Sequence, residues 1–381
     1  MGGGAVERWL NILQLLTLIC PVLAHAGIAI DPKLSLTVEE RYDDDALLRG
    51  EGTALGAELM TKLAPRLGLQ LRGHTFHSEA WYAPDLELRH LSRTFQINHR
   101  GGLEFRKRLS RRDTLLAQFQ VWRVEDPTSL PRMGLGRALE PVLYGTGELG
   151  FDSILSRRFQ TSLRYRLEGA YFYGGVTPPA AVHSPSIELW YRATRRASVG
   201  VEYRFQHFLY GTAWATSHAP AGLFRYRLAR FSTLTARAGP VQFHEPGRDG
   251  MAPRVLLELG HNTRHFELGV QAGQDLVGAS GYATAVWTQF AGGFGAWRLG
   301  SPFKIYSGAY FFRNGRAPGD PSTWFGGLSV ADGYAVFGGV EWRLHRQLMA
   351  QVQVDHVDQV GGGADVLARN IAAVRFVMTA W

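Results

Sequence analysis

Hydrophobic and polar residues alternate one by one along much of this chain. The segment 163–171 (LRYRLEGAY) has apolar residues or glycine at its odd positions and Arg, Arg and Glu at positions 164, 166 and 168. The segments 187–192, 199–206 and 334–344 repeat this period of two. Successive side chains of a β-strand point to opposite faces, so the pattern indicates strands with one apolar and one polar face. The predicted fold class is all-β.

The predicted connections alternate between short turns and longer loops that are rich in Gly, Pro and Asp. Eight short turns and nine long loops make 17 connections and hence 18 strands, with 16 as the alternative because the alternation is irregular in 232–243 and 282–297. A soluble sandwich can show the same period of two, but it does not require such regular alternation of connection length. An even strand number with short turns on one rim and long loops on the other is typical of transmembrane antiparallel β-barrels. The predicted short turns are at 64–66, 110–113, 156–159, 194–197, 229–232, 261–264, 299–302 and 345–346, and the predicted loops at 43–52, 83–92, 125–140, 174–185, 212–221, 244–253, 275–281, 313–329 and 356–367.

Both ends of the chain agree with export and membrane insertion. Residues 1–26 are predicted to be a signal peptide, with Arg8 before an apolar run of about 15 residues, which is shorter than the ~20 that a membrane helix needs. Residues 27–381 would then form the barrel in the bacterial outer membrane, with outer-membrane lipid and the barrel-assembly machinery as partners. The last strand is predicted to carry the membrane-insertion signal: Phe376 and Met378 on its apolar face, and the terminal aromatic residue Trp381 at the other parity.

Composition narrows the chemistry further. The formal net charge is +8, from 41 Lys and Arg against 33 Asp and Glu. The single cysteine, Cys20, lies inside the predicted signal, so no disulfide or cysteine metal site is expected. No basic run is interleaved with aromatic residues, so we expect no nucleic acid partner. Ten arginines on the short turns, from Arg108 to Arg346, predict a positive periplasmic rim.

Arginines also recur on the polar faces of the predicted strands. A lone Arg facing lipid at the bilayer midplane costs about 2–4 kcal/mol, so these side chains are expected to face the lumen. Two explanations stay open: they pair with the carboxylates of the same faces, or they attract an anionic solute, as basic rings do in anion pores. The aromatic side chains of Trp190 and Phe337 on these faces were candidates for stacking against sugar rings. The predicted lumen-lining residues are Arg72, Arg106, Arg164, Arg166, Arg192, Arg204, Arg225, Arg227, Arg343 and Arg375.

No motif for catalysis, a cofactor or a metal is present in the sequence. His74 and His77 are three positions apart, which puts them on opposite faces of a strand. A Ser-His-acid set can be drawn from His74, Ser78 and Glu79, or around Ser217 and His218, but neither follows a motif that fixes its geometry. The protein is therefore expected not to be an enzyme and to need no metal or cofactor.

Three phrases in the first third of the chain resemble a known family. LSLTVEERYDDD (34–45), APRLGLQLR (64–72) and NHRGGLEFRKRLSRRDTL (98–115) are similar to outer-membrane β-barrel proteins of exopolysaccharide and exosortase (PEP-CTERM) systems. The resemblance implies a role in secreting or anchoring a surface polysaccharide, with periplasmic export components as partners, and it implies no catalytic residues. The leading hypothesis is a pore or export channel. The alternatives are a structural or anchoring barrel with a closed lumen, and an enzyme with its site at the rim.

Overall fold

The chain forms one closed sheet of 18 antiparallel strands in a computed structural model, which describes residues 28–44, 56–125, 141–175, 178–278, 285–316, 329–361 and 366–380. Each strand pairs with its neighbours along the chain, and β1 also pairs with β18, so the sheet has no free edge. Among the described residues no helix is long and apolar enough to cross a membrane. The prediction of an 18-stranded antiparallel barrel is confirmed. The predicted signal peptide, residues 1–26, lies outside the described residues, and so does Trp381.

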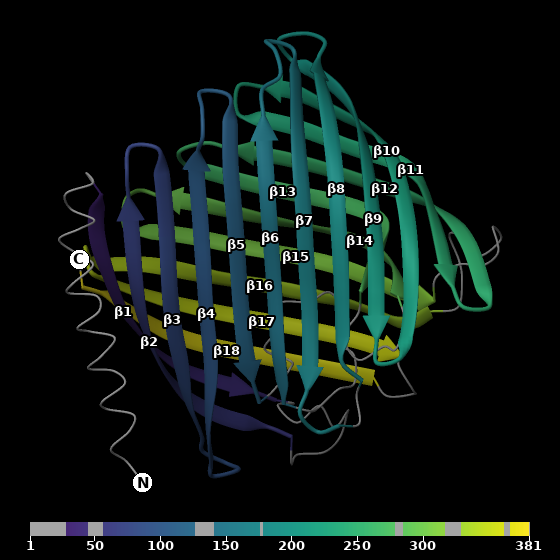
Figure 1. Cartoon of the computed structure of the whole chain (residues 1–381). Helices are drawn as coiled ribbons and strands as arrows, with labels where there is room; N and C mark the ends of the chain where they lie inside the picture. The colour runs from purple at the N-terminus through teal and green to yellow at the C-terminus, as the bar shows by residue number, and fades with distance from the viewer. Residues whose placement is uncertain are drawn as a thin grey trace, which may run out of the picture.

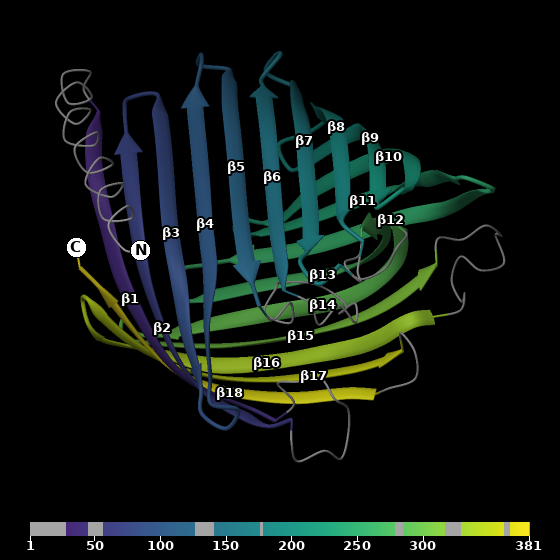
Figure 2. The same cartoon turned by 60° about the horizontal axis from the view of Figure 1, so that its bottom comes forward.

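The strands are long and follow one another directly. In Figure 1, β1–β9 form the wall nearer the viewer and β10–β18 the far wall, and the two sets of strands cross because strands tilt in a barrel. Figure 2 shows the same two walls from below. The strands are β1 (Ala29–Asp43), β2 (Glu58–Arg72), β3 (Phe76–Arg89), β4 (Thr94–Arg108), β5 (Asp113–Val124), β6 (Val142–Ser153), β7 (Phe159–Phe172), β8 (Ala180–Arg192), β9 (Ala197–Tyr210), β10 (Ala213–Ala229), β11 (Ser232–Glu245), β12 (Arg248–Asn262), β13 (Phe266–Gly278), β14 (Ala285–Leu299), β15 (Phe303–Arg316), β16 (Ser329–His345), β17 (Leu348–Gly361) and β18 (Val366–Thr379).

One rim holds both ends of the barrel chain and only short connections; we call it the short-turn rim. Its turns, at 73–75, 109–112, 154–158, 193–196, 230–231, 263–265, 300–302 and 346–347, match the predicted turns except the first. The predicted turn at 64–66 is wrong, because Pro65 lies inside β2, paired in register with Leu36 of β1. The other rim, called the long-loop rim, holds the remaining connections.

Several predicted loops on the long-loop rim are strand instead. The chain turns at 90–93, 211–212 and 246–247, so most of the predicted loops 83–92, 212–221 and 244–253 lies in strands. The prolines that indicated loops, Pro84, Pro220 and Pro253, all have register partners in the neighbouring strand. Gly211 and Gly247 have φ values of 58° and 81°, which allow turns of two residues. The long-loop rim therefore holds both short and long connections, so connection length alternates only partly along the chain.

Apolar side chains cover the outer face of the barrel. On β7, Leu163, Tyr165 and Leu167 are 45%, 38% and 39% exposed, while the residues between them point to the opposite side. Phe376 and Met378 of β18 belong to the same outer face, and their role in membrane insertion stays a prediction. A closed barrel satisfies all backbone polar groups and presents this face to hydrocarbon, which is how β-proteins span the bacterial outer membrane. The protein is thus an integral outer-membrane barrel.

Charged pairs join the first strand to the last at the seam of the barrel. The Arg369 guanidinium donates from Nε to both carboxylate oxygens of Asp43, at 2.9 and 3.0 Å, and both side chains are buried. Arg375 on β18 also pairs with Glu39 on β1. The backbone register across the seam runs from Ser35 opposite Thr379 to Asp43 opposite Ile371. The seam is therefore held by charges as well as by the β-ladder.

Candidate functional site in the barrel lumen

The strand register puts the predicted arginines on the faces opposite the exposed apolar side chains. Five of the ten pair with carboxylates. Arg164 contacts Asp152 at 2.7 Å and Glu148 at 3.2 Å, and Arg166 contacts the same Glu148 at 2.6 Å. The others with a carboxylate are Arg204 with Asp275, Arg375 with Glu39 and, at 4.0 Å, Arg72 with Asp31. Four of these five pair with a carboxylate of an adjacent strand, and Arg204 of β9 reaches Asp275 of the distant strand β13.

The other five form no ion pair with a carboxylate of the described residues, and they share a position in the fold. All are exposed and lie within a few residues of the short-turn end of a strand. Arginine charge without a nearby carboxylate is thus concentrated at one end of the barrel. These residues are Arg106, Arg192, Arg225, Arg227 and Arg343.

A hollow of about 530 Å³ lies at that end, between β7 and β11; we call it the arginine vestibule. Three strand arginines and four turn arginines contribute to its wall, and no Asp or Glu does. The four turn arginines lie close together, because the two short turns that carry them each connect adjacent strands of the barrel wall. The vestibule arginines are Arg157, Arg158, Arg192, Arg195, Arg196, Arg225 and Arg227.

Trp190 builds the floor of the arginine vestibule. The Arg225 guanidinium lies over its ring at 4.4 Å from the centroid, a cation–π contact. Beneath the ring is Gly200, where an added Cβ would lie 2.5 Å from the backbone oxygen of Leu189 and 3.2 Å from the ring itself. The Trp190 indole N–H donates to Glu188 Oε2 at 2.9 Å. Trp190 is only 5% exposed, so it holds Arg225 in place rather than offering a free ring to a sugar, as its predicted role required.

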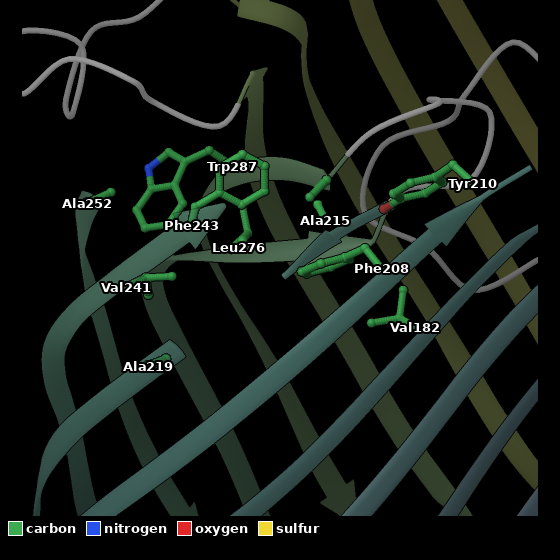
Figure 3. Packing of buried hydrophobic residues seen from close by; sticks show 11 residues of the cluster. Val182, Phe208, Tyr210, Ala215, Ala219, Val241, Phe243, Ala252, Leu276 and Trp287 are labelled. Carbon is green, nitrogen blue, oxygen red and sulfur yellow. The ribbon is translucent and has the colours of Figure 1, made fainter. Parts of the chain in front are cut away.

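The half of the lumen toward the long-loop rim has a different character, because its inward side chains are buried. Phe208 and Val142 are 0% exposed, and each belongs to an apolar cluster. The larger cluster joins β8–β12 to the tip of the β13–β14 hairpin, formed by 275–278 and 285–288. Figure 3 shows this cluster, with Trp287 and Phe243 on one side and Phe208 and Tyr210 on the other. Apolar packing thus occupies part of the barrel interior.

The tip of the hairpin leaves its neighbour β12 to reach this position. The β12–β13 register covers Val255–Asn262 against Glu267–Gln274 and stops there. An added Cβ on Gly278 would lie 2.4 Å from Cγ2 and 3.7 Å from Cβ of Val182, a residue of the distant strand β8. The tip therefore packs across the lumen against the inner face of β8 and β9.

Asp275 anchors the hairpin tip through charge. Its carboxylate accepts from Arg204 Nη1 at 2.8 Å and from Arg254 Nε at 3.2 Å. Arg254 is buried and also meets Glu202 at 3.2 Å. Glu202 in turn pairs with Arg237, which reaches Glu188 below the arginine vestibule at 3.1 Å. A continuous network of charges links the hairpin tip to the vestibule floor.

A second hollow, of about 500 Å³, lies against the inner face of the barrel and is lined by residues of β11–β16. It contains the aromatic side chains of Phe294, Tyr310 and Phe337, and also Glu258 and Gln271. Phe337 fits closely over Gly308, where an added Cβ would lie 2.4 Å from the ring. Of the two aromatic residues proposed to contact a sugar, Phe337 is the one that borders open space.

The structure does not bring the alternative catalytic sets together. Ser217 faces inward and donates to Gln206, whereas His218 faces outward and bonds to Tyr203 at 2.6 Å. Ser78 and Glu79 are likewise on opposite faces of β3, and His74 lies in the turn before it. Within the described residues no three His, Cys, Asp or Glu side chains group as metal ligands.

Sequence reasoning missed a set of Tyr–His pairs on the outer face near the long-loop rim. Each joins neighbouring strands diagonally, with the Tyr hydroxyl 2.6 to 3.3 Å from a ring nitrogen. The signal that identifies these pairs is a Tyr on one strand with a His on the adjacent strand, two positions away from the residue that pairs with the Tyr in the β-ladder. Such pairs satisfy the polar atoms of both rings where lipid replaces water. The pairs are Tyr82–His99, Tyr165–His183, Tyr203–His218 and Tyr334–His356.

Comparison with solved structures finds chains of the same architecture. OccAB4 of Acinetobacter baumannii and OpdQ of Pseudomonas aeruginosa each align with 92% of this chain and 98% of their own, at 10% identity and a TM-score of 0.48. A loop-deletion mutant of OmpT, an outer membrane protein of Vibrio cholerae, aligns with 93% of this chain and 100% of its own, at 10% identity and a TM-score of 0.42. No protein-family model matches the sequence, and no curated protein matches it. The likeness extends to barrel architecture alone.

Proposed function

We propose that this barrel is a non-enzymatic pathway for anionic solutes across the outer membrane, with acidic exopolysaccharide as its cargo. The observation behind the proposal is the separation of charge along the lumen. Arg164, Arg166 and Arg204 have carboxylate partners, whereas Arg192, Arg225 and Arg227 have none among the described residues and line a hollow. Charges in a cleft with low-dielectric walls focus the field and raise the local concentration of oppositely charged solute.

The direction of transport follows from the rim on which these arginines lie. Short turns are periplasmic in outer-membrane barrels, so the arginine vestibule faces the compartment from which a polymer is exported. Acidic polymer would meet positive charge first. The resemblance of the first third of the chain to exopolysaccharide-associated barrels supports the same cargo, with periplasmic export components as partners.

A closed structural or anchoring barrel is the second candidate. The inward-packed β13–β14 tip and the buried inward side chains near the long-loop rim favour it, because they occupy space that a wide pore leaves open. Single-channel recording in planar bilayers separates the two. The channel hypothesis predicts stable openings with anion preference, and a folded barrel that never conducts supports the anchor.

Charge reversal tests the role of the arginines. Arg225→Glu with Arg227→Glu is expected to shift the reversal potential in a KCl gradient toward cation preference. Arg164→Glu with Arg166→Glu is the matched pair on β7, where carboxylates already offset the guanidinium charge. A smaller shift is expected there. Equal selectivity in the wild type and in the Arg225/Arg227 variant would refute the anion pathway.

A further inference from the structure

We infer that the arginine vestibule is a binding site for the carboxylate groups of an acidic polysaccharide segment, with Arg225 as a contact residue and Trp190 and Gly200 as positioning residues. The inference rests on the proposed function, but it concerns binding, which is measurable without conduction. It goes further in naming the site, the ligand chemistry and the device that orients one guanidinium.

Arginine is well suited to this ligand. Its planar guanidinium matches a carboxylate with two parallel hydrogen bonds, and these are stronger than bonds between neutral groups. Within the described residues, no carboxylate forms an ion pair with any of the seven vestibule arginines. Arg158 Nη1 donates to the Tyr191 hydroxyl at 3.1 Å. The carboxylate-binding capacity of the set is otherwise not taken up by Asp or Glu of the described residues, whereas Arg164 and Arg204 are engaged by carboxylates.

Size and location narrow the ligand class. A volume of about 530 Å³ is within the ~300–1,000 Å³ range of small-ligand pockets. Such a hollow accepts part of an extended polymer chain, but it is too small for a folded acidic protein. Seven arginines spread over two turns and two strands match a ligand with regularly repeated negative charge, which a uronic acid polymer provides.

The Trp190 ring fixes where one of these charges stands. It is packed between Gly200 on one side and the Arg225 guanidinium on the other. Any side chain at position 200 would collide with the Leu189 backbone oxygen at 2.5 Å and press on the ring at 3.2 Å. A methyl group there must move the β8 backbone at Leu189, and it presses the Trp190 ring toward the Arg225 guanidinium. Glu188 holds the indole N–H at 2.9 Å, so the ring cannot yield freely by rotation.

The test is calorimetric titration of the full-length barrel in detergent micelles with short oligogalacturonate, in parallel with neutral dextran of similar length. We expect saturable binding of the uronate that weakens with salt, and at least tenfold weaker binding in the variant with Arg192→Gln, Arg225→Gln and Arg227→Gln. Arg164→Gln with Arg166→Gln is the control and is expected to bind within twofold of the wild type. Heat-modifiable migration verifies that each variant is folded.

Gly200→Ala tests the positioning role separately. It is expected to weaken uronate binding severalfold and to change Trp fluorescence. Adding Trp190→Phe to this variant makes room for the new methyl group and is expected to recover part of the affinity. Binding of dextran equal to that of uronate, or uronate affinity that survives loss of the three arginines, would overturn the site. Uronate binding without conductance would leave the site standing and refute the channel instead. Tight binding of an acidic protein but not of uronate would also overturn the assignment.

Discussion

The docking of the β13–β14 tip inside the lumen makes a quantitative prediction for Asp275→Asn. Breaking a buried ion pair by removing one partner costs about 3–5 kcal/mol. Here the cost is reduced, because the Asp275 side chain is 20% exposed and Arg254 keeps Glu202. Arg204, 15% exposed, loses its carboxylate. We therefore expect a loss of about 2–3 kcal/mol in the free energy of unfolding.

Urea unfolding of the barrel in lipid vesicles measures this loss, and bilayer recording measures its consequence. The weakened tip is expected to leave β8 more often, so single-channel conductance rises or openings become more frequent. Asp31→Asn is the control, because Asp31 pairs with Lys33 at an exposed site where such pairs contribute about 0–1 kcal/mol.

A disulfide provides the reverse perturbation. The Cβ positions of residues 182 and 278 are 3.7 Å apart, within the ~3.5–4.5 Å that a disulfide spans. Val182→Cys with Gly278→Cys is expected to form a disulfide readily. In the Asp275→Asn background this disulfide should return the conductance to that of the wild type until reductant is added. A loss below about 0.5 kcal/mol in Asp275→Asn, with conductance unchanged in both redox states, would refute the docked hairpin.

Three further predictions concern packing, the seam and the outer face, and urea unfolding in vesicles checks each. Gly239→Ala is expected to cost about 1–3 kcal/mol, because the new Cβ would lie 2.0 Å from the Pro220 backbone oxygen; Gly260→Ala, where nothing lies within 4 Å, should stay within about 0.5 kcal/mol. Arg369→Gln should cost about 3–5 kcal/mol, since it removes the guanidinium from a buried ion pair with Asp43, and a change no larger than that of the exposed control Lys33→Gln would contradict this. Tyr203→Phe should cost about 1 kcal/mol through the lost bond to His218, with Tyr226→Phe, whose ring stacks on Phe224, as the unaffected control.

Alternation of polarity was enough to predict the architecture, because lipid on one side and charged groups on the other impose it on nearly every strand. The same alternation places Arg164 and Arg225 on the strand faces opposite the exposed side chains of Leu163 and Phe224. It failed where both faces of a strand are buried. Val286, Trp287 and Thr288 are at most 5% exposed, so β14 has no polar face at its tip and its sequence looks irregular.

Proline and aromatic residues were misleading for another reason. Pro220 and Pro253 indicated loops, yet in this barrel they occupy strand positions with register partners. Tyr210 and Trp81 are of the residue types that form aromatic belts at the membrane surface, but Tyr210 is buried in the lumen cluster and Trp81 lies under Arg66. Arg204 pairs beyond its neighbouring strands: it lies on β9 and contacts Asp275 of β13, 71 residues away. No local pattern contains that information.

The buried pair across the seam has a consequence for the order of assembly. Asp43 and Arg369 are 326 residues apart and meet only when the first and last strands pair. A slip of that pairing by two residues would keep the side-chain parity and most of the ladder, yet it would separate the Arg369 guanidinium from the Asp43 carboxylate. The buried pair therefore favours the native register of ring closure over slipped ones, and in the closed ring it adds a charge contact to the β-ladder between the first and last strands.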